Sequence, residues 1–208
     1  MSKRGHPKFK FDRRIGENLW GVRRSSINRV QSAPGQHGDK PRGVMSEYCI
    51  RFIAKQKLKR YYCNLTESKF KKVFKKALKY KGNVSHNLIR LLEMRLDVLV
   101  YRACLAKSFR AARQLINHGH VLVNNRKVNI CSFECKPGDV FRVRPSFVNA
   151  PVVKQAVLEA EREVPPHIGI NYKYLVVRLL SVPIVSGSLY PVSMCPELVA
   201  EHYSGVRS

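Results

Sequence analysis

The chain has 208 residues, and 39 Lys and Arg against 14 Asp and Glu give it a formal net charge of +25. That excess is far beyond what solubility requires and indicates a polyanionic partner, with nucleic acid favoured over an anionic membrane surface. The sequence has no apolar run of about 18 residues, so we expect no membrane-spanning helix. It also lacks paired carboxylates, a phosphate-binding loop and a nucleophile with a nearby base. We therefore expect no enzyme and no small-molecule substrate.

Residues 1–45 are rich in glycine, proline and arginine and show little apolar periodicity. We expect an extended basic arm that RNA orders, and a disordered tail is the alternative. The turn-forming sequence PGQHG at residues 34–38 favours the ordered arm. The N-terminus lacks the apolar core of a secretory signal, and Asp12 and Glu17 come early for a mitochondrial presequence. We expect a cytoplasmic protein.

Apolar spacing predicts one helix over residues 46–62 and another from Thr66 to Gly82. Ser46 and Thr66 are the expected N-caps. Residues 51–81 contain twelve basic residues against a single carboxylate, and so many like charges destabilise an isolated helix unless a partner neutralises them. The first helix is expected to present a cationic surface made of Lys55, Lys57, Lys59 and Arg60.

Leucine periodicity predicts a further helix over residues 85–104, with Ser85 as its N-cap. Arg95 and Asp97 lie within this pattern, and we expect them to make ordinary surface or capping pairs.

Residues 108–128 predict a short helix, a glycine stop and a tight hairpin. Ser108 suits the N-cap, and Gly119 stands where a helix needs a left-handed residue to end. Asn124 and Asn125 suit a two-residue turn, because asparagine tolerates positive φ. The apolar side of the helix is expected to hold Phe109, Ala112, Leu115 and Ile116. The outward side, which suits a phosphate backbone, holds Arg110, Arg113, Gln114 and His118.

The C-terminal third is expected to contribute smaller elements. The sequence predicts a strand over residues 140–144, a helix over 151–161, a strand over 174–180, a loop over 183–191 and a helix over 196–203.

The six cysteines do not form a metal-binding pattern. Metal sites usually need paired, closely spaced ligands, and only Cys131 and Cys135 are close, without a second pair or nearby histidines. We expect buried thiols, no bound metal, no cofactor and, in a reducing cytosol, no disulfides.

Several of these stretches resemble known RNA-binding proteins. Within 108–128, Ser108, ARQL at 112–115, HGH at 118–120, VN at 123–124 and Val128 closely resemble the S-four RNA-binding domain. Further stretches outside this domain resemble the bacterial-type ribosomal protein S-four family. They are RRIG at 13–16, LWG at 19–21, APGQHG at 33–38, SEY at 46–48, KQKLKRYY at 55–62, LLEMRLD at 91–97 and EHYS at 201–204. The resemblance covers nearly the whole chain and is weakest in 145–195.

The resemblance implies an α+β fold with three parts. These are a basic N-terminal arm at 1–45, a mostly helical discontinuous domain made of 46–93 and about 165–208, and an S-four RNA-binding domain at 94–164. The implied role is structural: a component of the small ribosomal subunit that binds the 5′ domain of ribosomal RNA early in assembly. The implied further partners are neighbouring ribosomal proteins and messenger RNA near its entrance channel, where the family affects decoding accuracy.

Candidate RNA-binding residues come from both the arm and the two domains. They are Arg13, Arg14, Lys40, Arg42, Lys55, Lys57, Lys59, Arg60, Lys107, Arg110, Arg113, Gln114 and His118. The expected location is the small subunit of a bacterial ribosome or of a bacterial-type organellar one.

Two alternatives share the S-four domain. An RNA-modifying enzyme such as a pseudouridine synthase carries its catalytic aspartate in the tripeptide Arg-Leu-Asp, found here at residues 95–97, but too few residues remain for a catalytic sheet. A stand-alone RNA-binding protein would not need the family's motifs at residues 34–38 and 55–62.

The chain departs from the resembled family at four positions where that family usually has glycine. These positions hold Cys49, Cys63, Cys104 and Asn125. Each substitution is expected to cost on the order of 1 kcal/mol if the backbone there needs positive φ.

Overall fold

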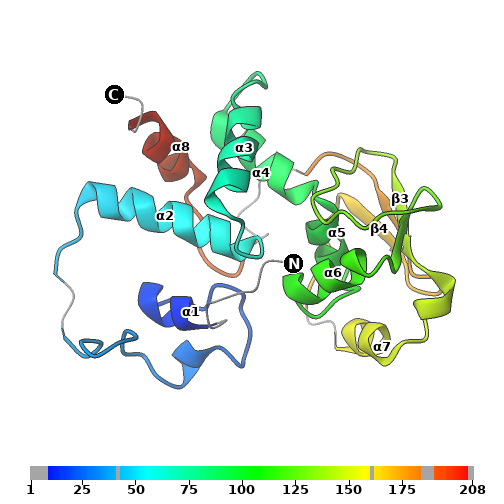
Figure 1. Cartoon of the computed structure of the whole chain (residues 1–208), viewed down its shortest axis with the longest axis horizontal. Coiled ribbons are helices and arrows are strands. Elements are labelled where there is room, and N and C mark those ends of the chain that lie inside the picture. Colours follow the sequence, from blue (N-terminus) through cyan, green and yellow to red (C-terminus); the bar gives the residue numbers. More distant parts are fainter. Residues whose placement is uncertain (1–8, 41–42, 160–161, 184–189, 206–208) are drawn as a thin grey trace. The chain divides into compact units, whose positions relative to one another are not determined.

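The structure is a computed structural model that describes residues 9–40, 43–159, 162–183 and 190–205. The chain divides into two compact units, Met1–Asn64 with Ser186–Ser208, and Leu65–Val185. Helices and an antiparallel sheet make up the fold (Figure 1), so the predicted α+β class is confirmed. Within the described ranges, none of the helices is both long and apolar enough to cross a membrane.

The first unit is helical. It contains α1 (Lys10–Ile15), the 3-10 helix η1 (Ser26–Asn28), α2 (Glu47–Tyr61) and α8 (Pro196–Ser204). Ser46 caps α2 as predicted, because its side chain accepts a hydrogen bond from the Cys49 amide. The core holds Tyr62, whose hydroxyl lies 2.6 Å from that of Tyr190.

The N-terminal arm is folded rather than extended over residues 9–40, so that part of the expectation is wrong. The buried Asp12 accepts a hydrogen bond from Ser25 Oγ at 2.6 Å. Arg13 Nε donates to the Ser32 carbonyl at 2.9 Å, and Trp20 Nε1 donates to the Tyr61 carbonyl at 3.2 Å. Protein contacts therefore contribute to the conformation of these residues, and ordering of the arm by RNA stays a prediction.

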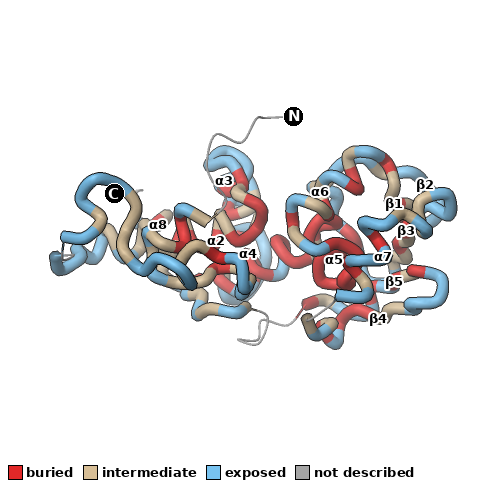
Figure 2. The backbone as a smooth tube through the Cα atoms, turned by 90° about the horizontal axis from the view of Figure 1, so that it is seen from below, coloured by how far each residue is buried: buried red, intermediate tan, exposed pale blue. Residues whose placement is uncertain are grey.

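The second unit begins with four helices, α3 (Glu67–Ala77), α4 (Val84–Glu93), α5 (Leu96–Arg102) and α6 (Phe109–Asn117). Helix α3 starts after Thr66 as predicted but ends five residues before Gly82, because the Lys79 amide bonds to the Lys76 carbonyl in a tightened last turn. Figure 2 shows that α5 is buried along its length.

The prediction of a single helix over residues 85–104 is wrong. The chain leaves the helical conformation at Arg95, where ψ is 140°. A distant segment stabilises this break: the Leu96 amide donates to the Phe133 carbonyl at 2.8 Å, and the Cys135 amide donates to the Met94 carbonyl at 2.9 Å. The first of the two helices is capped by Asn83, not by Ser85, since the Asn83 side chain accepts from the Ser85 amide.

A five-stranded antiparallel sheet completes the second unit. Its strands are β1 (Val121–Val123), β2 (Arg126–Lys127), β3 (Val140–Val143), β4 (Ile168–Asn171) and β5 (Val176–Leu179), in the order β2-β1-β3-β5-β4. Phe141, Val143 and Val177 are buried, whereas their neighbours along the strands, Arg142 and Val176, are half-buried. One face of the sheet therefore contributes to the core.

The predicted strands at 140–144 and 174–180 are confirmed as β3 and β5, but β4 was not predicted. The short helices at 151–161 and 196–203 are confirmed as α7 (Pro151–Leu158) and α8, and a 3-10 helix η2 (Pro145–Phe147) precedes α7. Most of the predicted loop at 183–191 lies outside the described residues. In the structure α3 and α4 belong to the same compact unit as the sheet, and the domain bounds proposed from the sequence stay a prediction.

Candidate nucleic-acid interface

Helix α6 separates a buried side from an exposed cationic side. Ser108 Oγ accepts from the Ala111 amide at 3.3 Å, so the predicted N-cap is confirmed. Gly119 has φ +72°, a left-handed conformation that favours glycine at the end of a helix. As predicted, the buried side holds Phe109, Ala112, Leu115 and Ile116. The exposed residues are Arg110, Gln114 and His118.

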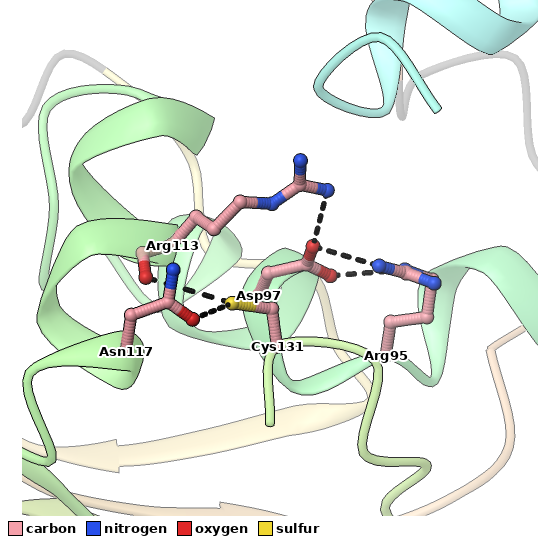
Figure 3. Close-up of polar contacts among 5 residues, drawn as sticks. All are labelled: Arg95, Asp97, Arg113, Asn117 and Cys131. Carbon is pink, nitrogen blue, oxygen red and sulfur yellow. Dashed lines mark hydrogen bonds and ion pairs between the residues drawn. The ribbon is translucent and has the colours of Figure 1, made fainter. Parts of the chain in front are cut away.

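The fourth residue expected to point outward, Arg113, is only half exposed because it takes part in a buried ionic cluster. Asp97, 1 % exposed, accepts from Arg95 Nε at 3.0 Å and from the Arg95 guanidinium at 2.9 Å. Arg113 donates to the same carboxylate at 3.1 Å (Figure 3). The expectation of ordinary surface or capping pairs for Arg95 and Asp97 is wrong. Asp97 instead fixes where the Arg113 guanidinium sits beside the exposed face of α6.

Cys131 and Cys135 behave as neutral thiols. The Cys131 thiol donates to Asn117 Oδ1 at 2.7 Å (Figure 3). Burial, and then the nearby Asp97 carboxylate, raise the pKa of the Cys131 thiol, and burial raises that of Cys135 to about 12. Among the residues that the structure describes, no group of three or more His, Cys, Asp and Glu side chains could hold a metal ion.

A second buried ion pair joins α4 to α5. Glu93, fully buried, accepts from Arg102 at 2.7 and 3.1 Å. His167 lies near this pair, and burial lowers its pKa more than the Glu93 carboxylate raises it.

The pKa of His167 makes a prediction for acid stability. Because the folded-state pKa lies below the ordinary value of about 6.5, the unfolded state binds the proton first as pH falls. Stability is thus expected to fall as the pH drops below about 6.5, and this loss should be smaller in His167→Gln. Urea unfolding at several pH values measures it. His86→Gln, at an exposed imidazole, is the control, and an equal pH dependence in both variants would contradict the prediction.

The prediction that α2 presents a cationic surface is wrong for its two central lysines. Lys55 and Lys57 are buried. Lys55 Nζ lies 5.0 Å from the centroid of the Phe52 ring, and Lys57 Nζ lies 2.5 Å from a carboxylate oxygen of Glu17. Both cations are covered because α8 packs on one side of α2 and the arm on another.

Two arginines proposed for RNA also make contacts inside the first unit. The Arg60 guanidinium lies 4.3 Å from the centroid of the Phe11 ring, and Arg13 bonds to Ser32 and Ala33. These contacts connect the arm to itself and to α2. The remaining candidates there are Lys59, half-buried, and Arg14 and Lys40, both exposed. Arg42 lies outside the described residues.

In the second unit the structure brings five candidates together around α6. Lys107, just before the helix, is exposed and pairs with Glu159 at 2.8 Å. The exposed lysines of α3 were not among the RNA-binding residues predicted from the sequence, although the run of like charges was visible there. They are Lys69, Lys71, Lys72 and Lys75.

Three of the four residues at usual glycine positions do have positive φ. The angles are 61° at Cys63, 56° at Cys104 and 64° at Asn125. The fourth, Cys49, lies in the first turn of α2, where any residue fits. The expected cost of a side chain therefore applies to three positions.

Asn125→Gly is expected to stabilise the protein by up to about 1 kcal/mol, because glycine adopts this left-handed conformation without strain. The neighbouring Asn124→Gly is the matched control and should destabilise. Asn124 also has positive φ, but its side chain donates to Asp139 at 2.9 Å and accepts from the Val140 amide at 3.0 Å. Urea midpoints compare the two variants. Destabilisation by Asn125→Gly would contradict the prediction.

Comparison with known proteins agrees with this arrangement. The family model described as ribosomal protein S4/S9 N-terminal domain matches residues 3–93, and the S4 domain model matches residues 94–141. Proteins named small ribosomal subunit protein uS4 are similar over 98% of this chain and 100% of their own length. Those from Rhizobium leguminosarum bv. trifolii and Agrobacterium fabrum are 48% identical, and that from Caulobacter vibrioides is 47% identical. This chain belongs to the uS4 family of small ribosomal subunit proteins.

Proposed function

We propose that this protein is a structural component of the small ribosomal subunit that binds ribosomal RNA directly and is not an enzyme. The observation that carries the proposal is the exposed face of α6. Arg110, Gln114 and His118 lie over a buried apolar side, and Asp97 holds Arg113 beside them. Guanidinium and amide groups on a rigid helix suit phosphates and 2′-hydroxyls, which is how proteins recognise folded RNA.

The binding region in the RNA is, in this proposal, a helix junction of the 5′ domain, bound early in assembly. A formal charge of +25 supports strong attraction to phosphates through counterion release. Charge alone does not choose a sequence or a shape, so the rigid α6 face supplies the selectivity. Neighbouring ribosomal proteins are the further partners.

The candidate RNA contacts divide by exposure. Around α6, Lys107, Arg110, Arg113, Gln114 and His118 are proposed to contact RNA. In the first unit Arg14, Lys40 and Lys59 remain candidates, and Arg42 stays with them as a sequence-based one. Arg13, Lys55, Lys57 and Arg60 are proposed to act mainly by positioning the arm, given their contacts with protein groups.

Lys40 and Arg42 support a finer proposal, that the arm lies near the entrance of the messenger-RNA channel and affects decoding accuracy. Lys40 is exposed at the end of the turn-rich segment 34–40. The proposed location is the cytoplasmic small subunit, of a bacterial ribosome or of a bacterial-type organellar one.

A binding experiment tests the proposal. Purified protein is titrated with a 5′-domain fragment of small-subunit ribosomal RNA and with an unrelated RNA of equal length, at several salt concentrations. We expect a preference of about a hundredfold, roughly 3 kcal/mol, that persists as salt weakens the general attraction. Affinities that fall equally for both RNAs would instead indicate a general basic RNA-binding protein.

A further inference from the structure

The sheet of the second unit has a second, less buried face. Cross-strand pairing places Leu122, Arg142, Val176 and Asn171 side by side on β1, β3, β5 and β4. Directly paired residues point to the same side of a sheet, so these four residues define what we call the outer face. Arg178, two residues after Val176, lies on the same face and is exposed.

A groove opens at this outer face. Its volume is about 560 Å³, within the range of sites that hold small organic ligands. The polar and aromatic groups in its lining are two cations, Arg142 and Lys173, two amides, Asn149 and Asn171, and the ring of Tyr174. The described residues that line it include no carboxylate, so the groove is complementary to an anion.

Two side chains in the groove lining bear on what it could bind. Arg142 Nε is buried and has no hydrogen-bond partner among the described residues, an unfavourable state that is relieved if this half-buried side chain turns toward a ligand's acceptor. Tyr174 is 61 % exposed, and a base can stack on the face of its ring that Lys173 does not cover. Lys173 Nζ lies over the ring, 5.6 Å from its centroid, which places a positive charge at the other face.

We propose that this groove binds one unpaired nucleotide of RNA, an inference that rests on the proposed RNA-binding function. The base stacks on Tyr174, the amides of Asn149 and Asn171 bond to its edge, and the phosphate lies between Arg142 and Lys173. Aromatic rings beside basic side chains are how proteins hold single-stranded RNA. The groove is separate from the α6 residues and would let the protein hold an unpaired nucleotide next to a folded RNA element.

The test uses the full chain and a labelled single-stranded decamer of uridine, with affinity measured by fluorescence anisotropy. Tyr174→Ala is expected to weaken binding roughly 5- to 100-fold, from the loss of one base-stacking contact. Tyr172→Ala is the matched control, because Tyr172 is also exposed, at 49 %, and does not line the groove. Arg142→Gln and Lys173→Gln should each reduce the slope of log affinity against log salt by about 0.7.

The outcomes separate this inference from the proposed function. The proposed function depends on the wild-type preference for the 5′-domain fragment, which the same assay measures. If that preference is present but Tyr174→Ala binds the decamer as Tyr172→Ala does, or if the wild type does not bind the decamer, the groove proposal is overturned and the function stands. A photo-crosslink from position 174 to a ribosomal protein instead of RNA, in assembled subunits, would also overturn it.

Discussion

Asp97→Ala is expected to lower the free energy of unfolding by about 3–5 kcal/mol, the usual cost of removing one partner from a buried ion pair. Asp97 is 1 % exposed and accepts hydrogen bonds from two arginines, Arg95 and Arg113. The substitution would leave the Arg95 guanidinium, itself buried, without its bidentate partner. Urea unfolding measures the change as a shift of the midpoint at constant slope.

The control for Asp97→Ala is Glu134→Ala, which removes the carboxylate of a surface ion pair with Lys76. Glu134 is 42 % exposed in its side chain, and such surface pairs contribute about 0–1 kcal/mol. Asp97→Asn keeps the shape of the side chain and removes its charge, so it separates the ionic part of the effect from packing. A loss below about 1 kcal/mol for Asp97→Ala would show that the cluster does not stabilise the fold.

The features predicted correctly from the sequence are those set by neighbouring residues. Ser108 caps α6 and Gly119 ends it because each acts within a few residues of the helix end. Asn124 and Asn125 form the hairpin turn because both adopt positive φ. Such short-range signals predict α6 and its hairpin with little information from the rest of the chain.

The features that were missed depend on distant segments. The break at Arg95 is stabilised by hydrogen bonds to residues 131–135, which helical periodicity cannot indicate. Strand β4 contains Gly169 and Asn171, both weak strand formers, and exists through its pairing with β5. Lys55 and Lys57 looked exposed because a helical pattern places residues on faces and does not say how many faces the rest of the protein covers.

Only part of the candidate site could be predicted from the sequence, because the rest of it depends on distant segments. The exposed residues of α6 follow from its amphipathic pattern. The carboxylate that positions Arg113 comes from α5, and the groove beside Arg142 is formed by three strands and the segments that flank them. Pairing across the sheet brings those residues together, although they lie far apart in the sequence.

Arg110→Glu is expected to weaken binding to the 5′-domain fragment by about tenfold or more, at least roughly 1.4 kcal/mol. Arg110 is exposed at the start of α6, on the face proposed to contact RNA. The substitution replaces an attraction to phosphate with a repulsion at the same position. It should also reduce the slope of log affinity against log salt by about one phosphate contact. Anisotropy titrations at several salt concentrations measure both quantities.

Lys154→Glu on α7 is the matched control for Arg110→Glu. Lys154 is also exposed on a helix of the second unit, and its substitution changes the net charge by the same amount. If general attraction to a protein of charge +25 explained binding, the two variants would lose affinity equally. A larger loss for Arg110→Glu, confined to the 5′-domain fragment, would instead show that α6 recognises this RNA. If Arg110→Glu and Lys154→Glu lose the same affinity for each RNA, a specific role for the α6 face is ruled out, because the position of the charge on the surface would then not matter.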